Sequence, residues 1–386
     1  MDLEAPRPRL PTLTSLRFFA ASHVFCFHLL AFKIVTGRSV FAAVASIGYV
    51  GVSLFFVLSG FILVYTYAGR NVKAAEFWRA RFARIYPAYV FSLLVTLPWF
   101  LYAVFYGYWQ VVPWPVAHLK LAMLLQIALL HAWVPPAALV WNAVSWSLSV
   151  EAFFYLLFPY LLKCFARVSC TWLIALGILC WCATLAITAT YTALNPDGLK
   201  QINSDVNGFW LNVVKFNPLV RLPEFLIGMA CGFHFLRARA NPKLAFPLVC
   251  SGLLGFAVVV YFSDRIPYPM LHTSLLAPAF AIIIYGLALQ PSLPATLNLR
   301  PMVLLGDASY SFYLLHRFLV WVCFFSMKLR LRQNIGGVLL CFAIICGLSI
   351  LIYLFLEEPM RRKLRGQRKP AFARSVQACS AGRAVV

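Results

Sequence analysis

Apolar stretches of about twenty residues recur along this chain, and each is long enough to cross a lipid bilayer as an α-helix. Only 11% of the residues are charged, against about 25% in a soluble domain, and the mean hydropathy is +0.83. Because a backbone inside lipid must satisfy its own hydrogen bonds, this pattern predicts an all-α, polytopic membrane bundle. The candidate segments are residues 13–32, 44–67, 86–106, 117–132, 148–163, 171–193, 221–237, 245–262, 271–289, 307–327 and 336–356.

The positions of the basic residues reduce these segments to about ten transmembrane helices. Lysine and arginine in short loops mark the cytoplasmic side of a membrane protein. If residues 117–132 do not cross, nearly all of the basic clusters fall on that side, together with both termini. This segment is about sixteen residues long and contains His118, Lys120, Gln126 and His131, so we interpret it as a re-entrant or interfacial piece.

The ten-span arrangement divides the chain into three parts. We expect a cytoplasmic N-terminal segment at 1–12, a single transmembrane domain at 13–359 and a basic, disordered cytoplasmic tail at 360–386. The net charge of +22 is typical of nucleic-acid binding, but the basic residues gather at helix ends and in the tail. That distribution suits anionic membrane lipids and predicts no nucleic-acid partner. The cysteines lie mostly in apolar segments without a close-spaced His/Cys ligand set, so we predict no metal site.

The first apolar segment carries two ionisable residues on one helical face. Arg17 and His28 are eleven positions apart, about three turns, so their side chains project in one direction about 16 Å apart along the axis. An ionisable group within a bilayer costs about 2.5 to 3.5 kcal/mol on insertion scales, which favours a functional role for each residue. The structural alternatives are an Arg17 that snorkels to the headgroups and a His28 that is satisfied within the core.

A carboxylate follows in the stretch WNAVSWSLSVEAFFYLLFP, residues 141–159. In the ten-span topology Glu151 lies at the depth of His28, where it would fix the imidazole tautomer and raise its basicity. A general base needs both properties. The alternative is that Glu151 forms a structural ion pair with a nearby arginine.

Other polar residues within apolar helices are candidates for a channel or an acceptor site. Arg221 and Glu224 are i, i+3 neighbours at the start of a helix. Together with Trp146 they either line the channel or acceptor site, or the two charged residues form an ion pair with each other. Tyr310 and His316 place polar groups along a later helix, with His316 near the membrane midplane. They either line a passage or bond to a neighbouring helix.

Three arginines precede a helix in FWRARFARIYPAYV, and we call Arg79, Arg81 and Arg84 the arginine cluster. Guanidinium groups bind phosphates and stack on flat rings. With Trp78 and Tyr86 alongside, the cluster suits a ligand that bears several phosphates and a ring. The alternative is ordinary positive-inside anchoring beside an aromatic belt.

Taken together, seven stretches resemble the integral-membrane acyltransferase-3 family, the bacterial O-acyltransferases that modify surface polysaccharides, lipopolysaccharide, nodulation factors or antibiotics. Each stretch is weak evidence alone, but their joint order from residue 13 to 359 is specific. The stretches are LRFFAASHVFCFH, GYVGVSLFFVLSGF, RARFARIYPAY, WSLSVEAFFYLLFP, RLPEFLIGMACG, LGDASYSFYLLH and LEEP.

This resemblance implies transfer of an acyl group, usually acetyl, from cytoplasmic acyl-CoA to a hydroxyl of a carbohydrate, glycolipid or other acceptor. It implies a multi-pass protein of the bacterial plasma (inner) membrane with no tightly bound cofactor, acyl-CoA being a co-substrate. The family's essential arginine and histidine match Arg17 and His28, its carboxylate matches Glu151, and its donor-side arginines match the arginine cluster. His28 would then be the general base, held by Glu151.

Two alternatives of other classes remain open from the sequence. In a proton-coupled transporter or exporter of a small metabolite, His28, Glu151 and His316 would form the proton relay and the arginines an anion gate. A non-catalytic membrane partner in an envelope assembly would need none of these residues for chemistry.

Overall fold

Helices make up nearly all of the computed structural model, which describes residues 7–37, 39–106, 114–291, 294–325, 331 and 333–365. Within these ranges no strand is present, so the predicted all-α class is confirmed. The first six residues and residues 366–386, which include most of the predicted tail, lie outside the described part of the chain.

The helices follow one another through short connections. The α-helices are α1 (Pro11–Ala31), α2 (Val40–Ser46), α3 (Gly51–Tyr67), α4 (Ala74–Phe105), α5 (Trp114–Ala117), α6 (Leu119–Ile127), α7 (Trp146–Ala166), α8 (Cys170–Leu194), α9 (Phe209–Phe216), α10 (Pro218–Arg237), α11 (Ala245–Tyr261), α12 (Tyr268–His272), α13 (Ala277–Leu289), α14 (Arg300–Phe325), α15 (Ile335–Ile352) and α16 (Glu358–Arg365). The shorter turns are the 3-10 helices η1 (Gly48–Val50), η2 (His131–Trp133), η3 (Pro135–Ala137), η4 (Ala143–Ser145), η5 (Pro242–Leu244), η6 (Ser263–Arg265), η7 (Ser274–Leu276) and η8 (Ala295–Asn298), and the π-helical turn η9 (Tyr353–Glu357).

Nine helical segments of the described chain are long and apolar enough to cross a membrane, and the apolar helix Ser274–Leu289 is a shorter tenth. Each of the ten predicted spans therefore has a helix, and the polytopic bundle is confirmed. The structure extends two of them. The span predicted at 307–327 begins at Arg300, and the one predicted at 336–356 continues through the π turn η9.

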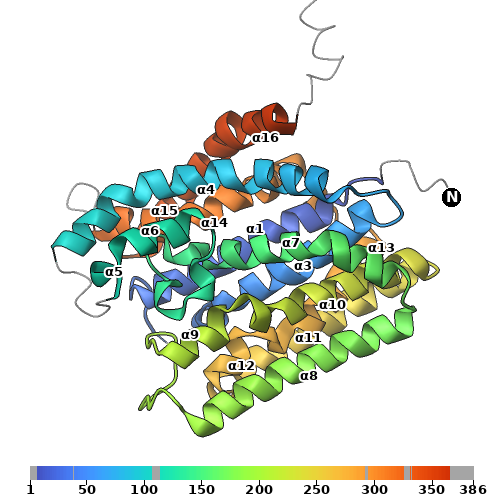
Figure 1. Ribbon diagram of the computed structural model, residues 1–386, viewed down its shortest axis with the longest axis horizontal. Helices are drawn as coiled ribbons and strands as arrows, with labels where there is room; N and C mark the ends of the chain where they lie inside the picture. Colours follow the sequence, from blue (N-terminus) through green and yellow to red (C-terminus); the bar gives the residue numbers. More distant parts are fainter. Residues whose placement is uncertain are drawn as a thin grey trace, which may run out of the picture.

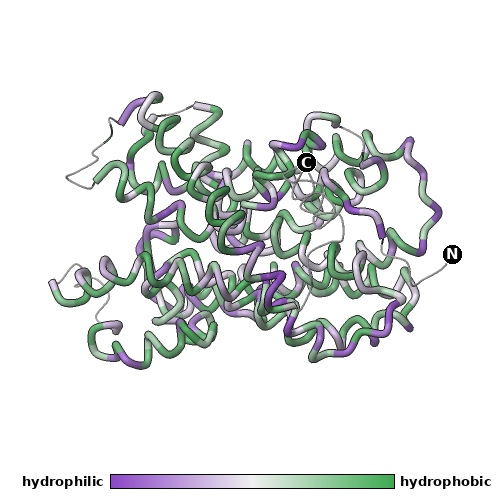
Figure 2. The backbone as a smooth tube through the Cα atoms, turned by 90° about the horizontal axis from the view of Figure 1, so that it is seen from above, coloured by the Kyte–Doolittle hydropathy of each residue, from purple (hydrophilic) through white to green (hydrophobic). Residues whose placement is uncertain are grey.

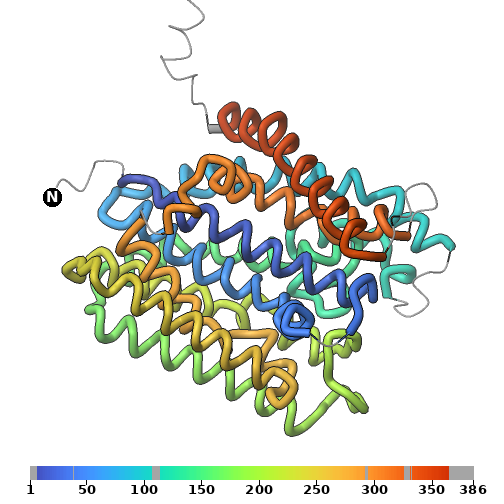
Figure 3. The backbone as a smooth tube through the Cα atoms, turned by 180° about the vertical axis from the view of Figure 1, so that it is seen from behind, coloured from blue at the N-terminus to red at the C-terminus, as the bar shows by residue number. Residues whose placement is uncertain are grey.

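The helices lie roughly side by side in three groups (Figure 1). Helices α4, α14, α15 and α16 occupy one side, α1, α3 and α7 the middle, and α8, α10 and α11 the opposite side, an arrangement that the view from behind repeats (Figure 3). Hydrophobic residues predominate along the backbone, with hydrophilic ones both in connections and inside the bundle (Figure 2). Polar side chains on the middle helices can therefore contact partners on helices of either outer group.

Both ends of the described chain lie near the connection between α3 and α4. The guanidinium of Arg7 donates to the Ala68 carbonyl at 2.8 Å, at the end of α3. Arg79, near the start of α4, donates through Nε to the Leu364 carbonyl of α16 at 3.0 Å. Two ends on one side of a bundle require an even number of crossings, as ten spans provide.

Residues 117–132 do not form a spanning helix. Helix α6 has nine residues, which is about 14 Å of rise against the roughly 30 Å of a bilayer core. The segment is held by buried polar contacts: Gln126 donates to Ser145 Oγ at 2.6 Å, and His131 Nε2 lies 3.3 Å from the same oxygen. Burial lowers the pKa of His131 to about 4, so its ring is neutral at physiological pH. The prediction that this segment does not cross is confirmed.

Glycines bring the backbones of the middle helices into direct contact. A Cβ on Gly228 of α10 would lie 2.0 Å from the Val57 carbonyl oxygen of α3, and one on Gly306 of α14 would lie 2.2 Å from the Thr14 carbonyl oxygen of α1. Small residues at such crossings let membrane helices gain close packing, which replaces the hydrophobic effect as the driving force in lipid. The pairs α3–α10 and α1–α14 thus fix the framework of the bundle.

Substituting Gly228 by valine should disrupt the α3–α10 crossing, because the new side chain must displace backbone rather than a flexible side chain. We expect a loss of about 1 to 3 kcal/mol of unfolding free energy, measured by thermal unfolding of the purified protein in detergent. Gly347→Val is the matched control, since a Cβ at this helical glycine meets nothing within 4 Å. A Gly228→Val protein as stable as the control would contradict the proposed crossing.

Candidate active site

A cavity inside the bundle, which we call the basic cavity, is enclosed by α1, α3, α4, α7 and α14. It contains about 700 Å³ of space not filled by protein atoms, part of it open to the surface. Five predicted site residues meet in this one place. The polar residues lining it are Arg17, Ser59, Arg81, Arg84, Ser147, Glu151, Tyr155, Ser309, Tyr310 and Tyr313.

Positive charge dominates the basic cavity. None of the ion pairs in the described ranges involves Arg17, Arg81 or Arg84. Arg81 is only 7% exposed and its guanidinium lies over the rings of Tyr67 and Tyr155, yet its buried Nε has no hydrogen-bond partner. Guanidinium groups without a carboxylate partner attract anions, so the cavity suits a phosphate-bearing ligand.

Glu151 projects from α7 into the basic cavity. Its carboxylate accepts hydrogen bonds from Ser59 Oγ at 3.3 Å and from the Tyr155 hydroxyl. These contacts go to α3 and α7, whereas those of His28 go to α1 and α14. The predicted pairing of Glu151 with His28 is therefore wrong. The sequence does not show that α7 begins only after buried 3-10 turns, which put Glu151 at the level of Arg17.

His28 pairs instead with His316. Nε2 of His316 lies 3.1 Å from Nδ1 of His28, with the ring centroids 4.9 Å apart. The His316 side chain is fully buried. It comes three residues after Tyr313, which lines the basic cavity, and one before Arg317, which lines a second cleft. The histidine pair therefore lies between the two spaces.

The second space, which we call the aromatic cleft, lies beyond the histidine pair. It comprises about 1440 Å³, including its open mouth. The rings of Trp99 and Trp321 are 3.8 Å apart between centroids, and Phe100 stacks on Trp141 at 5.2 Å. Flat aromatic faces beside amides and a cation suit a ligand with both apolar faces and hydroxyl groups. The polar and charged residues lining it are Thr96, Asn142, Asn207, Asn212 and Arg317.

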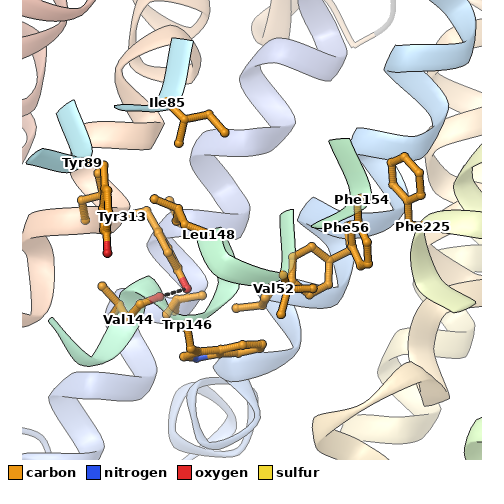
Figure 4. Close-up of a cluster of buried hydrophobic side chains, with 14 of the residues drawn as sticks. Val52, Phe56, Ile85, Tyr89, Val144, Trp146, Leu148, Phe154, Phe225 and Tyr313 are labelled. Atoms are coloured by element: carbon orange, nitrogen blue, oxygen red, sulfur yellow. Dashed lines mark hydrogen bonds between the residues drawn. The ribbon is translucent and has the colours of Figure 1, made fainter. Parts of the chain in front are cut away.

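Packed side chains fix the walls of the basic cavity (Figure 4). The Tyr313 hydroxyl donates to the Val144 carbonyl at 2.8 Å, which joins α14 to the turn before α7. Phe154 of α7 stacks on Phe225 of α10 with centroids 4.8 Å apart, and Phe56 of α3 meets Phe154 edge to face. This packing excludes water and holds the cavity-lining helices in register.

Several predicted site residues lie outside both spaces. Arg79 is exposed and bonded to α16, so only Arg81 and Arg84 of the arginine cluster face the cavity. Arg221 and Glu224 were candidates for a channel or acceptor site, but they line neither space and form a buried ion pair at 3.1 Å between Nε and Oε2, as the structural alternative expects. Trp146 packs against this pair, with the Arg221 guanidinium 5.5 Å from its ring centroid.

Two contributions were missed from the sequence. Tyr155 follows Glu151 by one turn and bonds to it, a spacing that could have been read from the helix period. Glu357 accepts a hydrogen bond from Ser311 and lines a small crevice that also includes Arg17 and Arg84. It lies in the LEEP stretch at the end of the π turn η9, and no local pattern in the sequence predicts that turn. In the described ranges no group of three or more His, Cys, Asp or Glu side chains is suited to a metal ion.

The comparison with known proteins decides the class of this site. The sequence matches a family described as "Acyltransferase domain" over residues 10–354. The chain belongs to this acyltransferase family. It is 29% identical over 328 residues to the acyltransferase MdmB of Streptomyces mycarofaciens, with 80% of this chain and 78% of the relative covered.

Two further relatives carry more descriptive names. The exopolysaccharide production protein ExoZ of Rhizobium meliloti is 29% identical over 340 residues, covering 84% of this chain and 93% of its own. The O-acetyltransferase OatA of Staphylococcus aureus is 26% identical over 406 residues, covering 95% of this chain but 60% of its own length. No solved structure matches the fold. The predicted family is confirmed, and the chain is an integral membrane O-acyltransferase.

Removing one member of the buried Arg221–Glu224 pair should destabilise the protein strongly. Arg221→Met leaves a carboxylate buried without a cation, which costs about 3 to 5 kcal/mol. The double variant Arg221→Met with Glu224→Leu should recover most of that loss, because no uncompensated charge remains. Thermal unfolding in detergent measures both. Equal stability of the single variant and the wild type would contradict a structural role for the pair.

Proposed function

We propose that this O-acyltransferase takes an acyl group, most simply acetyl, from cytoplasmic acyl-CoA and transfers it to a hydroxyl of a carbohydrate-type acceptor. The observation that carries the proposal is the position of the histidine pair between a basic cavity and an aromatic cleft. A base at this point can meet a donor that enters from one side and an acceptor that enters from the other.

The basic cavity is the proposed donor site. Acyl-CoA bears several phosphates, and the guanidinium groups of Arg17, Arg81 and Arg84, which form no ion pair within the described ranges, would provide charge-assisted hydrogen bonds for them. The positive-inside rule puts the arginine cluster on the cytoplasmic side, where acyl-CoA is made. The lining of the cavity extends to Tyr313, three residues before His316, so the proposed donor site reaches the neighbourhood of the histidine pair.

The aromatic cleft is the proposed acceptor site. Its lining includes Phe32, directly after α1, about 22 Å from Arg17 at 1.5 Å of rise per residue, so the proposed acceptor site lies toward the end of α1 opposite to the donor site. Sugar rings present apolar faces to aromatic side chains and hydroxyls to amides. The relatives named for exopolysaccharide production and O-acetylation support an acceptor of this chemistry.

The chemistry uses His28 as a general base. The acceptor oxygen attacks the thioester carbonyl carbon while His28 takes the hydroxyl proton, so that a C–O bond forms as the C–S bond breaks. The proton then passes from His28 to the departing thiolate, which leaves as free CoA thiol. The products are an ester and CoA, and the imidazole is regenerated neutral.

Acyl transfer can be tested with the purified protein in lipid nanodiscs, [14C]acetyl-CoA and pools of surface glycan precursors. We expect label in an ester-linked product and release of CoA. General-base assistance is worth about 10² to 10⁴-fold, so His28→Ala should reduce the rate by that factor while leaving the protein folded. A turnover in His28→Ala equal to that of the wild type would exclude His28 as the general base. Absence of thioester cleavage with every pool, together with movement of a metabolite across the membrane, would favour the transporter.

Arg84 and Arg79 of the arginine cluster differ in position, one facing the basic cavity and one lying outside it, so their substitutions can be compared. Arg84→Gln removes a cation that lines the basic cavity, whereas Arg79→Gln removes one that contacts α16 outside it. A hydrogen bond to a charged group is worth about 1.5 to 3 kcal/mol, so Arg84→Gln should raise the KM for acyl-CoA roughly 10- to 100-fold. Arg79→Gln should leave that KM nearly unchanged. Similar effects of the two substitutions would mean that the donor phosphates bind elsewhere.

A further inference from the structure

The two histidines at the centre of the bundle come from α1 and α14 and are joined by a hydrogen bond. Their ring planes are inclined by 66°, and Nε2 of His316 lies 3.1 Å from Nδ1 of His28. A hydrogen bond between two imidazoles requires one nitrogen to carry the hydrogen and the other to present a lone pair. The remaining contacts of each ring decide which is which.

His316 must present a lone pair at Nε2. Its Nδ1 lies 2.7 Å from the Tyr313 carbonyl oxygen, which can only accept a hydrogen bond. Nδ1 therefore carries the hydrogen, and in a neutral ring Nε2 does not. This tautomer is assigned from the hydrogen-bond partners, as the tautomer of a histidine ring is in most structures.

His28 must carry its hydrogen at Nδ1. This nitrogen lies 2.9 Å from the Val24 carbonyl oxygen and also faces the lone pair of His316, so both of its partners are acceptors. The neutral ring then has its lone pair at Nε2. None of the hydrogen bonds within the described ranges uses His28 Nε2, so this atom is free to take a proton from a substrate. Two backbone carbonyls thus determine both tautomers.

We propose that His316 is a positioning residue for the general base, an inference that rests on the proposed function. It holds His28 with Nε2 unprotonated and stabilises the positive charge that forms there. When His28 takes the acceptor proton, its Nδ1–H becomes part of an imidazolium, and the bond to His316 becomes charge-assisted and roughly twice as strong. The interaction is thus stronger in the transition state than in the ground state, as catalysis requires.

The surroundings of the pair favour a neutral partner for His28. His316 is fully buried and stacks on Phe312, with centroids 6.1 Å apart and an angle of 12°. The adjacent Arg317 lies over the ring of Phe32, within the aromatic cleft. Backbone contact of α1 with α14 at Gly306 holds together the two helices that carry the rings. A second imidazole can therefore do what a carboxylate does for a catalytic histidine, without a buried anion.

The test is a double-variant cycle on the full-length protein in nanodiscs, assayed with acetyl-CoA. His316→Leu should lower kcat about 100-fold while the KM for acetyl-CoA changes less than about 3-fold. His316→Gln, whose amide oxygen can reach the position of the lost Nε2, should recover at least a tenth of the activity. In the His28→Ala background, His316→Leu should change the residual rate less than about 3-fold, because a positioning residue acts only through its base.

His131→Gln is the control for loss of a buried histidine, because His131 belongs to neither space. It should keep wild-type kcat. A purely structural role for His316 would reduce activity in both backgrounds alike and would lower the yield of folded protein. Additive losses, or full activity in His316→Leu, would overturn the proposal while leaving the O-acyltransferase assignment in place.

Nitrogen NMR of histidine-labelled protein provides a readout that does not depend on acyl transfer. At pH 8 we expect neutral rings with the hydrogen on Nδ1 at both positions, assigned by the signals lost in His28→Ala and His316→Leu. A hydrogen on Nε2 of His28 would overturn the proposal even if the protein transferred no acyl group. The proposed function has its own test: it is contradicted if the wild-type protein cleaves no acyl-CoA, whatever the tautomers of the two histidines.

Discussion

The contact between α1 and α14 is the interaction on which the site depends. Gly306 has no side chain, so the α14 backbone meets that of α1 at Thr14 and the two helices stay together along their length. Each helix then contributes in turn to the basic cavity, the histidine pair and the aromatic cleft. A wider crossing would separate His28 from His316, because their hydrogen bond spans the gap between the two helices.

Buried charges in this bundle follow two different rules. Arg221 has Glu224 as its partner, and its guanidinium also donates to the His272 carbonyl at 2.6 Å. Both partners belong to the helical framework, so the Arg221 charge is balanced without a ligand. Arg81 is nearly as buried but has aromatic rings and a tyrosine hydroxyl in place of a carboxylate. A buried cation without a carboxylate partner is costly unless an anionic ligand binds to it. An arginine such as Arg81 is therefore a better indicator of a ligand site than an ion-paired one such as Arg221.

Hydropathy and loop charge were enough to predict the helical bundle and the non-crossing segment, because both depend on properties local to each stretch. The eleven-residue spacing likewise predicted that Arg17 and His28 share a face of α1. Partners on other helices could not be predicted in this way. Glu151 was expected beside His28 from its distance to a presumed helix start, but turns η2 to η4 occupy part of the bundle, and α7 begins deeper.

The replacement of that carboxylate by His316 has a consequence for the reaction. A carboxylate beside a catalytic imidazole stabilises the imidazolium ion but places an anion in the bundle. A neutral imidazole stabilises the same positive charge through one hydrogen bond without a buried anion. In the proposed reaction, His28 would act as base toward the acceptor and then as acid toward the leaving thiolate. Because Glu151 lies in the basic cavity, its negative charge acts on the arginines there and not on the base. The structure thereby separates the groups suited to binding a charged donor from the group suited to moving the proton.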